Sequence, residues 1–97
     1  MAHIEITRND DSSRYEATVD GALAGFAEFA LTEHAITFTH TEVDPAFEGQ
    51  GIASTLVQAA LDAVRASGRD VVAFCPYVKA WIARHPDYQD LVRVVRS

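Results

Sequence analysis

The chain has 97 residues and a formal net charge of −6; 48% of its residues are hydrophobic and 23% are charged. This size and balance predict one soluble globular domain, spanning residues 1–97, with a single hydrophobic core. The acidic charge argues against a general nucleic-acid binder and against docking on anionic membranes, whereas it is compatible with a cationic partner such as an amine or a lysine side chain.

The cysteine count and the first residues bear on the compartment. Cys75 is the only cysteine, so the chain cannot form an intramolecular disulfide, and a reducing compartment is expected. The start of the chain shows no basic region followed by an apolar core, and no apolar run approaches the roughly 20 residues that span a bilayer. The histidines and the cysteine lack metal-ligand spacing. We expect a cytoplasmic protein without a metal site, without nucleic-acid or membrane partners, and either monomeric or weakly homodimeric through an open sheet edge.

Four segments of the first half have the alternating pattern of β-strands. They cover residues 2–7, 14–19, 22–31 and 35–43. Asp20-Gly21, between the second and third segments, is a strong signal for a two-residue hairpin turn. Gly25, inside the third segment, indicates a bulge or a close backbone contact. Together the four strands predict an antiparallel meander.

The second half changes to the helical period. Apolar residues at positions 53, 56, 57, 60, 61 and 64 lie on one face of a helix, and Gly68 is placed as its C-terminal cap. The nearly continuous apolar run over 70–75 predicts an interior strand covered on both faces. A second helix is expected from about Pro76 to Arg84 and a short one after Pro86. The fold class is therefore α/β (α+β), and a parallel crossover between the fourth and fifth strands should be right-handed.

Two glycines, Gly49 and Gly51, separate the fourth strand from the first helix. The first backbone N–H groups of a helix lack intrahelical partners, and the helix dipole adds partial positive charge at the same end. Glycines let the backbone approach a phosphate closely. The arrangement favours an anion site made of backbone groups, although two glycines before a helix can also serve only as a turn. The sequence lacks the Gly-Lys-Ser/Thr of a Walker loop and the third glycine of the dinucleotide fingerprint.

The turn Glu48-Gly49-Gln50-Gly51-Ile52-Ala53 resembles the acetyl-CoA-binding motif of the GCN5-related N-acetyltransferase (GNAT) superfamily, Gln/Arg-x-x-Gly-x-Gly/Ala. Gly51 and Ala53 match the motif, whereas Glu48 stands where the family has Gln or Arg. The replacement at position 48 affects the side-chain contact to phosphate that the motif implies. The backbone contacts that the motif implies for residues 49–54 do not depend on this side chain. The resemblance implies acetyl-CoA or CoA as the cofactor.

Three segments bring the chain closer to the small single-domain branch of this superfamily, the YjdJ-like or N-acetyltransferase domain-containing proteins. They are His40-Thr41-Glu42-Val43, the glycine turn with its helix, and Cys75-Pro76-Tyr77-Val78-Lys79 running on to His85-Pro86. The resemblance implies a truncated GNAT fold: a mostly antiparallel sheet of about five strands, a β-α-β CoA-binding unit and one or two C-terminal helices. The helices that longer members place after the first strand and use at the acceptor site are missing, so the resemblance does not identify the acceptor.

The resemblance also implies a set of cofactor-binding residues. They are Val43, Glu48, Gly49, Gln50, Gly51, Ile52, Ala53 and Ser54 around the turn, with Cys75, Tyr77 and Lys79 at the start of the second helix. The strand that bears Val43 could orient the thioester through its backbone N–H groups. Lys79 is a candidate for a contact to a CoA phosphate, or it is simply solvated.

Cys75, His40 and Tyr77 are the candidate catalytic residues. A thiol at the start of a helix is more available as the thiolate, so Cys75 could carry a transient acetyl group; otherwise it is a small buried apolar residue. His40 is expected to share a strand face with Ile36 and Phe38, either as a general base or as a core histidine bonded to a carbonyl. Tyr77 is a candidate acid for the departing CoA thiolate, or a packing residue.

These features predict an acetyl-CoA-dependent N-acetyltransferase that acts on an unidentified amine, a small molecule or a protein lysine, either directly or through Cys75. Glu42 is a further candidate as a base or as a contact for a cationic acceptor, although a solvated strand carboxylate explains it equally well. A CoA-binding or acyl-CoA-sensing module with little or no turnover is the alternative, because position 48 is replaced and the acceptor-side helices are missing. A plain interaction domain is the third hypothesis.

Overall fold

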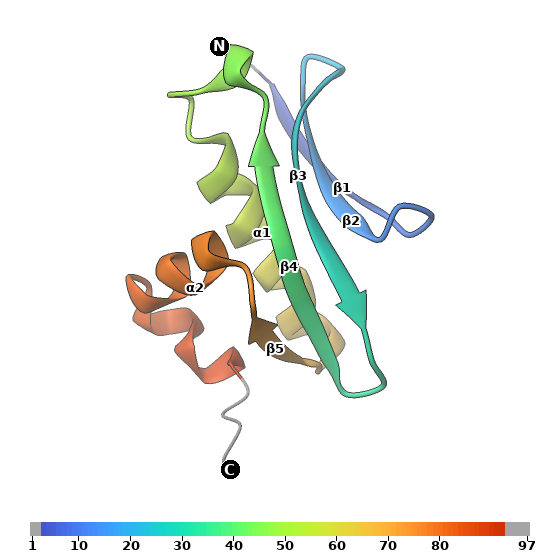
Figure 1. Ribbon diagram of the computed structural model, residues 1–97, viewed down its shortest axis with the longest axis vertical. Coiled ribbons are helices and arrows are strands. Elements are labelled where there is room, and N and C mark those ends of the chain that lie inside the picture. Colours follow the sequence, from blue (N-terminus) through green and yellow to red (C-terminus); the bar gives the residue numbers. More distant parts are fainter. Residues whose placement is uncertain (1–2, 93–97) are drawn as a thin grey trace.

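Five strands form one sheet, and their spatial order is their order in the chain. They are β1 (Ile4–Asn9), β2 (Arg14–Val19), β3 (Ala22–Leu31), β4 (Ala35–Val43) and β5 (Asp70–Ala73). The first four pair antiparallel as a meander, and β5 runs parallel to β4 (Figure 1). The computed structural model of the chain describes residues 3–92, and Ala2, expected in the first strand, lies outside this range. The predicted meander and fold class are confirmed.

The β2–β3 hairpin follows from its turn residues. Asp20 and Gly21 have φ angles of 49° and 88°, so both central residues lie in the left-handed region. Val19 pairs with Ala22 on either side of them. Two consecutive positive φ angles are typical of the type I′ turn, whose twist matches that of the flanking strands. The hairpin predicted from Asp20-Gly21 is therefore confirmed.

Helix α1 (Ile52–Ser67) covers one face of the sheet and connects β4 to β5. Its buried residues are Ile52, Leu56, Val57, Ala60, Leu61 and Val64. Gly68 caps the helix with a φ of 78°, and its N–H donates to the carbonyl of Arg65. In Figure 1, α1 lies behind the sheet and β5 lies to the left of β4, so the parallel crossover is right-handed, as expected.

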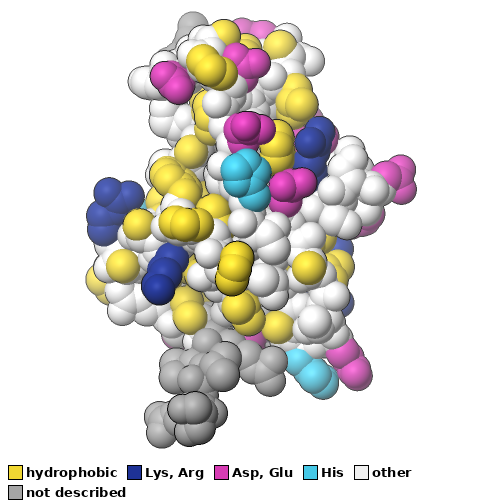
Figure 2. All heavy atoms as spheres, in the orientation of Figure 1, with side chains coloured by type: hydrophobic (Ala, Val, Ile, Leu, Met, Phe, Trp, Pro, Cys, Tyr) yellow, Lys and Arg dark blue, Asp and Glu magenta, His cyan; other side chains and the backbone are white. Residues whose placement is uncertain are grey.

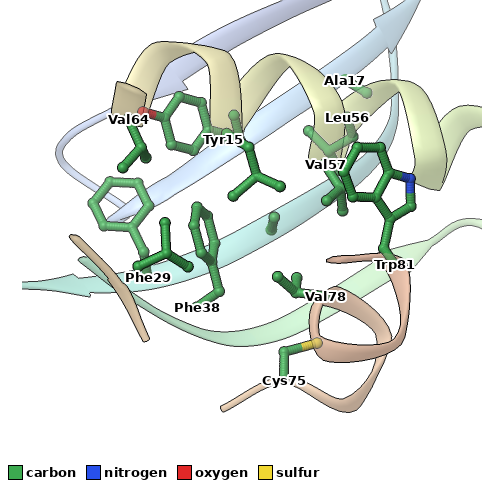
Figure 3. Close-up of a cluster of buried hydrophobic side chains, with 14 of the residues drawn as sticks. Tyr15, Ala17, Phe29, Phe38, Leu56, Val57, Val64, Cys75, Val78 and Trp81 are labelled. Atoms are coloured by element: carbon green, nitrogen blue, oxygen red, sulfur yellow. The ribbon is translucent and has the colours of Figure 1, made fainter. Parts of the chain in front are cut away.

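The core fills the space between the sheet and the helices (Figure 3). Phe29 and Phe38 of the sheet belong to the same buried cluster as Leu56 of α1. Trp81 projects from helix α2 (Pro76–Ala83) toward α1 and is 1% exposed. Burying a large apolar side chain contributes about 2–3 kcal/mol, so α2 is anchored mainly by this tryptophan and its apolar neighbours.

Strand β5 departs from the expectation of an interior strand, because it lies at the edge of the sheet. It pairs with β4 from Ala35↔Asp70 to Phe38↔Ala73, and on its other side the described residues form an isolated bridge from Val71 to Val92. Its apolar run is explained by packing against α1 and α2, which buries Val71 completely. An apolar run thus reports which faces are covered and not how many strands lie beside it. A short 3-10 helix, η2 (Pro86–Leu91), follows α2. Within residues 3–92, no helix has the length and apolar character needed to cross a bilayer.

Candidate functional site

The turn between β4 and α1 is shaped by backbone conformation. Asp44 caps the short 3-10 helix η1 (Pro45–Phe47) by accepting a hydrogen bond from the Ala46 N–H at 2.9 Å. Gly49 and Gly51 then have φ angles of 82° and 73°. A Cβ at either position would meet no atom within 4 Å. The left-handed conformation, and not the space within the protein, therefore requires glycine at both positions.

The N-terminus of α1 is open. Gly51 is its N-cap and makes no side-chain capping bond. The N–H of Thr55 donates to the Gly51 carbonyl at 3.1 Å, so the N–H groups of Ile52, Ala53 and Ser54 precede the first bond of the helix. α1 has 16 residues, and its dipole adds partial positive charge at this end. This is the geometry that an anion site made of backbone groups requires.

A hollow of about 250 Å³ opens beside this turn. Its lining combines the turn with the end of β4 and the start of α2: Val43, Phe47, Glu48, Gly49, Gly51, Ile52, Ala53, Ser54 and Tyr77. All of these except Phe47 are residues that the resemblance implies. The signal for Phe47 in the sequence is an aromatic residue two positions after Pro45, just before the glycine turn. Three implied cofactor residues, Gln50, Cys75 and Lys79, are not part of this lining.

A partly buried hydrogen bond connects the first turn of α1 to α2. Trp81 Nε1 donates to Ser54 Oγ at 2.9 Å. The His85 ring stacks on Trp81 with centroids 3.7 Å apart, and its Nδ1 lies 2.6 Å from the Trp81 carbonyl oxygen. His85, in the segment that resembles the family, therefore packs against the tryptophan that supports the turn.

Strands β4 and β5 separate at Phe38. Phe38 and Ala73 are the last paired residues, and the Phe38 carbonyl accepts hydrogen bonds from the N–H groups of Phe74 and Cys75 at 3.1 and 2.8 Å. β4 continues to Val43, whereas the other chain segment turns into α2. The backbone of β4 beyond Phe38 is thus not paired with β5, and an extended ligand can hydrogen-bond to such an edge.

Cys75 is the N-cap of α2 and is 3% exposed. Its Sγ lies 3.5 Å from Thr41 Oγ1 on β4, as the donor of a weak hydrogen bond. Figure 3 shows the sulfur at the margin of the hydrophobic cluster, close to Val78. The thiol is therefore placed where β4 and β5 separate, but it is covered from solvent.

β4 carries a bulge next to His40. Phe38 pairs with Phe29, and His40 pairs with Glu28, so β4 uses two residues where β3 uses one. Such an insertion places one extra residue, here Thr39, in the strand and reverses the alternation of its faces beyond that point.

The predicted position of His40 on the face of Ile36 and Phe38 is therefore wrong. Ile36 and Phe38 are 1% exposed, whereas His40 is exposed to solvent. Its ring centroid lies 6.1 Å from that of Phe26, on the face opposite α1, and Arg14 lies 4.5 Å from the same Phe26 ring. His40 thus belongs to the outer face of the sheet.

Residues 14–91 match the model of a protein family described as GCN5-related N-acetyl-transferase. The match runs from β2 to η2 and includes the glycine turn. The chain belongs to the GCN5-related N-acetyltransferase family. The superfamily named from the glycine turn is confirmed, whereas the small single-domain branch stays a prediction. No curated protein sequence matches the chain.

Solved structures of this family share the fold. A GCN5-like protein from Staphylococcus aureus has a TM-score of 0.72 and 19% identity over 99% of this chain and 94% of that chain. The ribosomal-protein-S18-alanine N-acetyltransferase from Escherichia coli has a TM-score of 0.60 and 21% identity over 67% of this chain and 43% of that chain. AAC(6')-Iy, in complex with the bisubstrate analog CoA-S-monomethyl-acetylneamine, has a TM-score of 0.54 and 16% identity over 87% of this chain and 66% of that chain. The chain thus spans less than half of the Escherichia coli enzyme, and at these identities the likeness concerns the fold alone.

Proposed function

We propose that the chain is an N-acetyltransferase that binds acetyl-CoA at the glycine turn and transfers the acetyl group to an amine. Its family carries out acyl-CoA-dependent acetyl transfer in general. The observation that supports the proposal most directly is the open N-terminus of α1. It lies in the lining of a hollow together with Gly49 and Gly51, both in the left-handed conformation.

The pyrophosphate of CoA would be held by backbone groups. The N–H groups of Ile52, Ala53 and Ser54 precede the first bond of α1, and the helix dipole is equivalent to about half a positive charge at this end. A chain of net charge −6 can therefore bind a phosphorylated ligand without a basic cluster. Glu48 belongs to the same lining, and its negative charge would oppose this binding.

The pantetheine arm would follow the backbone of β4 beyond Phe38 and bring the thioester toward Val43 and Tyr77. In direct transfer the amine nitrogen attacks the thioester carbon, a C–N bond forms and the C–S bond breaks. The amine gives up one proton to a base, and the departing CoA thiolate takes one from an acid. Tyr77 is half-buried and lines the hollow, so it is the candidate acid. His40 is the candidate base for an amine that approaches from the outer face.

A covalent route through Cys75 is the competing mechanism. Its thiolate would attack the thioester and release CoA, and the amine would then attack the acetyl-cysteine and release the Cys75 thiolate. This route needs the thiol to become reachable, because it is 3% exposed and is in contact with Thr41. Burial therefore favours the direct route.

A CoA-binding or acyl-CoA-sensing module with little turnover is the second candidate. Glu48, in the lining of the hollow, is the observation that favours it, because a carboxylate near the phosphates serves neither affinity nor transfer. The two candidates differ in one observable. A module binds acetyl-CoA without amine-dependent release of CoA.

Release of CoA from acetyl-CoA, measured with a panel of amines and with intact-mass analysis of the protein, tests the proposal. We expect amine-dependent release that falls about a hundredfold in Tyr77→Phe, the scale of a lost general acid. Tyr88→Phe is the matched control, because Tyr88 lies on η2 and bonds to Asp62, outside the lining of the hollow. An acetyl adduct that disappears in Cys75→Ala would establish the covalent route. Binding without release would establish the sensing module, and the absence of both would contradict the proposal.

A further inference from the structure

A second hollow, of about 300 Å³, lies on the outer face of the sheet, opposite α1. Its walls include Leu23 and Phe26 of β3 and Glu42 and Asp44 at the end of β4. Val43 lines both this hollow and the hollow at the glycine turn, so the two adjoin across one residue of β4. Figure 2 shows this face, where carboxylates gather over the upper half of the sheet among hydrophobic side chains.

A bulge in β3 and a close approach of β4 build this hollow. Leu23 and Gly25 pair with consecutive residues of β2, so Ala24 is an extra residue in β3. A Cβ on Gly25 would lie 2.7 Å from the Glu42 carbonyl oxygen, which means that only glycine permits the two strands to approach as they do. Leu23, next to the bulge, is 46% exposed and places a large apolar side chain at the rim of the hollow.

Two carboxylates lie in the walls of the hollow, and one of them, Asp44, also accepts the Ala46 N–H at 2.9 Å. Glu42 and Asp44 are both exposed carboxylates in its walls. Arg14 lies 4.5 Å from the Phe26 ring on the same face, but it is already paired with Glu16 at 2.7 Å. A ligand cation would therefore meet Glu42 and Asp44, while Leu23 and Phe26 offer apolar surface beside them. Carboxylates beside apolar walls favour a cation that carries an apolar group over an anionic ligand.

We propose that this hollow is the acceptor subsite and that it takes a primary amine, bound as its ammonium, whose carbon chain carries a compact apolar or aromatic group. The inference rests on the proposed function and names its acceptor class. The ammonium pairs with Glu42 and Asp44, and the apolar group packs against Leu23 and Phe26. A volume of about 300 Å³ fits a small molecule, at the lower end of known ligand sites.

The transfer reaction changes the charge of the bound molecule, and this change favours release of the product from the subsite. The bound ammonium first loses one proton to water, after which the nitrogen attacks the thioester carbon. The C–N bond forms and the C–S bond breaks. The second proton of the nitrogen passes to the base, His40, and the CoA thiolate takes its proton from the acid, Tyr77. The amide product is neutral, so its attraction to Glu42 and Asp44 is lost and it binds more weakly than the substrate.

The test is a titration of the protein with phenethylamine in the absence of acetyl-CoA, in which binding is monitored through the backbone amide chemical shifts. The comparison ligands are 3-phenylpropionate, an anion of similar shape, and N-acetylphenethylamine, the neutral product. We expect phenethylamine to bind most tightly and to shift the amides of residues 23–26 and 42–44. Glu42→Gln should weaken its binding about three- to tenfold, as expected for one partly exposed ion pair. Glu33→Gln is the matched control and should change nothing, because Glu33 is an exposed carboxylate at the opposite end of the β3–β4 hairpin.

Equal binding of phenethylamine and 3-phenylpropionate, or equal effects of Glu42→Gln and Glu33→Gln, would overturn the inference. Acetyl-CoA binding is measured separately on the same samples. If acetyl-CoA binds and the amine does not, the acceptor subsite is wrong and the proposed function stands. If the amine shifts the amides of residues 23–26 and 42–44 and acetyl-CoA does not bind, the subsite stands as an ammonium site and the transferase proposal fails.

Discussion

Trp81 Nε1 donates a hydrogen bond to Ser54 Oγ at 2.9 Å, and this bond joins the core of α2 to the third residue of α1. The indole is 1% exposed, so its N–H has no access to bulk water. The same serine lines the hollow beside the glycine turn. The position of the first turn of α1 therefore depends on a buried side chain from the C-terminal part of the fold.

Removing this hydroxyl should destabilise the protein. Ser54→Ala leaves the Trp81 N–H buried without an acceptor, which costs about 1–3 kcal/mol in the free energy of unfolding. Thr55→Ala is the matched control, because Thr55 is the next residue of the same helix and is exposed. Urea unfolding followed by tryptophan fluorescence measures both. Equal midpoints for the two variants would show that the Trp81–Ser54 bond contributes nothing.

Substitutions at two glycines of the same conformation distinguish an effect on cofactor binding from an effect on stability. Gly51 and Gly68 have φ angles of 73° and 78° at the two ends of α1, and a Cβ on either would meet no atom within 4 Å. Replacing each by alanine should therefore cost a similar amount, about 1 kcal/mol. Only Gly51→Ala should also weaken acetyl-CoA binding, by about tenfold, because it moves the N–H groups at the helix start. Thermal denaturation and calorimetric titration check the two effects, and an equal loss of binding in Gly68→Ala would refute the assignment.

The carboxylate of Glu48 should limit affinity for the cofactor. Glu48→Gln removes a negative charge from the lining of the hollow and restores one of the residues that the family motif has at this position. We expect acetyl-CoA to bind about three- to tenfold more tightly, with the gain shrinking at high salt because exposed charges are screened. The measurement is calorimetric titration at two ionic strengths. A Kd that does not change would mean that the phosphates do not lie near this residue.

The contact between α1 and η2 should respond to acid. Arg65 binds the Asp90 carboxylate, with Nη1 and Oδ2 2.9 Å apart, and its hydrogen bond holds the pKa of Asp90 below the ordinary value of an aspartate. A carboxyl whose pKa is lower in the folded state stabilises the fold above its unfolded pKa, about 3.9, and this contribution is lost as the pH falls through the folded pKa. Arg65→Gln should return the pKa of Asp90 to its ordinary value. NMR titration of the Asp90 carboxyl measures this, and an identical pKa in both proteins would contradict it.

The parts of the fold that sequence could predict are those encoded by local chemistry. Asp20-Gly21 specifies a hairpin because both positions need positive φ, and Gly68 ends α1 for the same reason. The glycine turn could be located because Gly49 and Gly51 interrupt two clear periodicities. These features depend on residues adjacent in the chain.

The parts that sequence could not predict depend on pairing between strands. The bulge that turns His40 to the outer face is visible only in the register of β4 against β3, because Thr37, Thr39 and Thr41 suit either face. The edge position of β5 was missed because helices, and not strands, bury Val71. The hollow on the outer face of the sheet likewise depends on the close approach of Gly25 to β4.

Backbone amide shifts of the protein during titration with CoA report directly whether the glycine turn binds the cofactor. We expect the largest changes on Gly49, Gly51, Ile52, Ala53 and Ser54. We expect smaller changes at residues 39–43 from the pantetheine arm, and none at the far end of α1 near Gly68. Saturable shifts confined to another surface, or no shifts at millimolar CoA, would contradict the claim that this turn binds the cofactor.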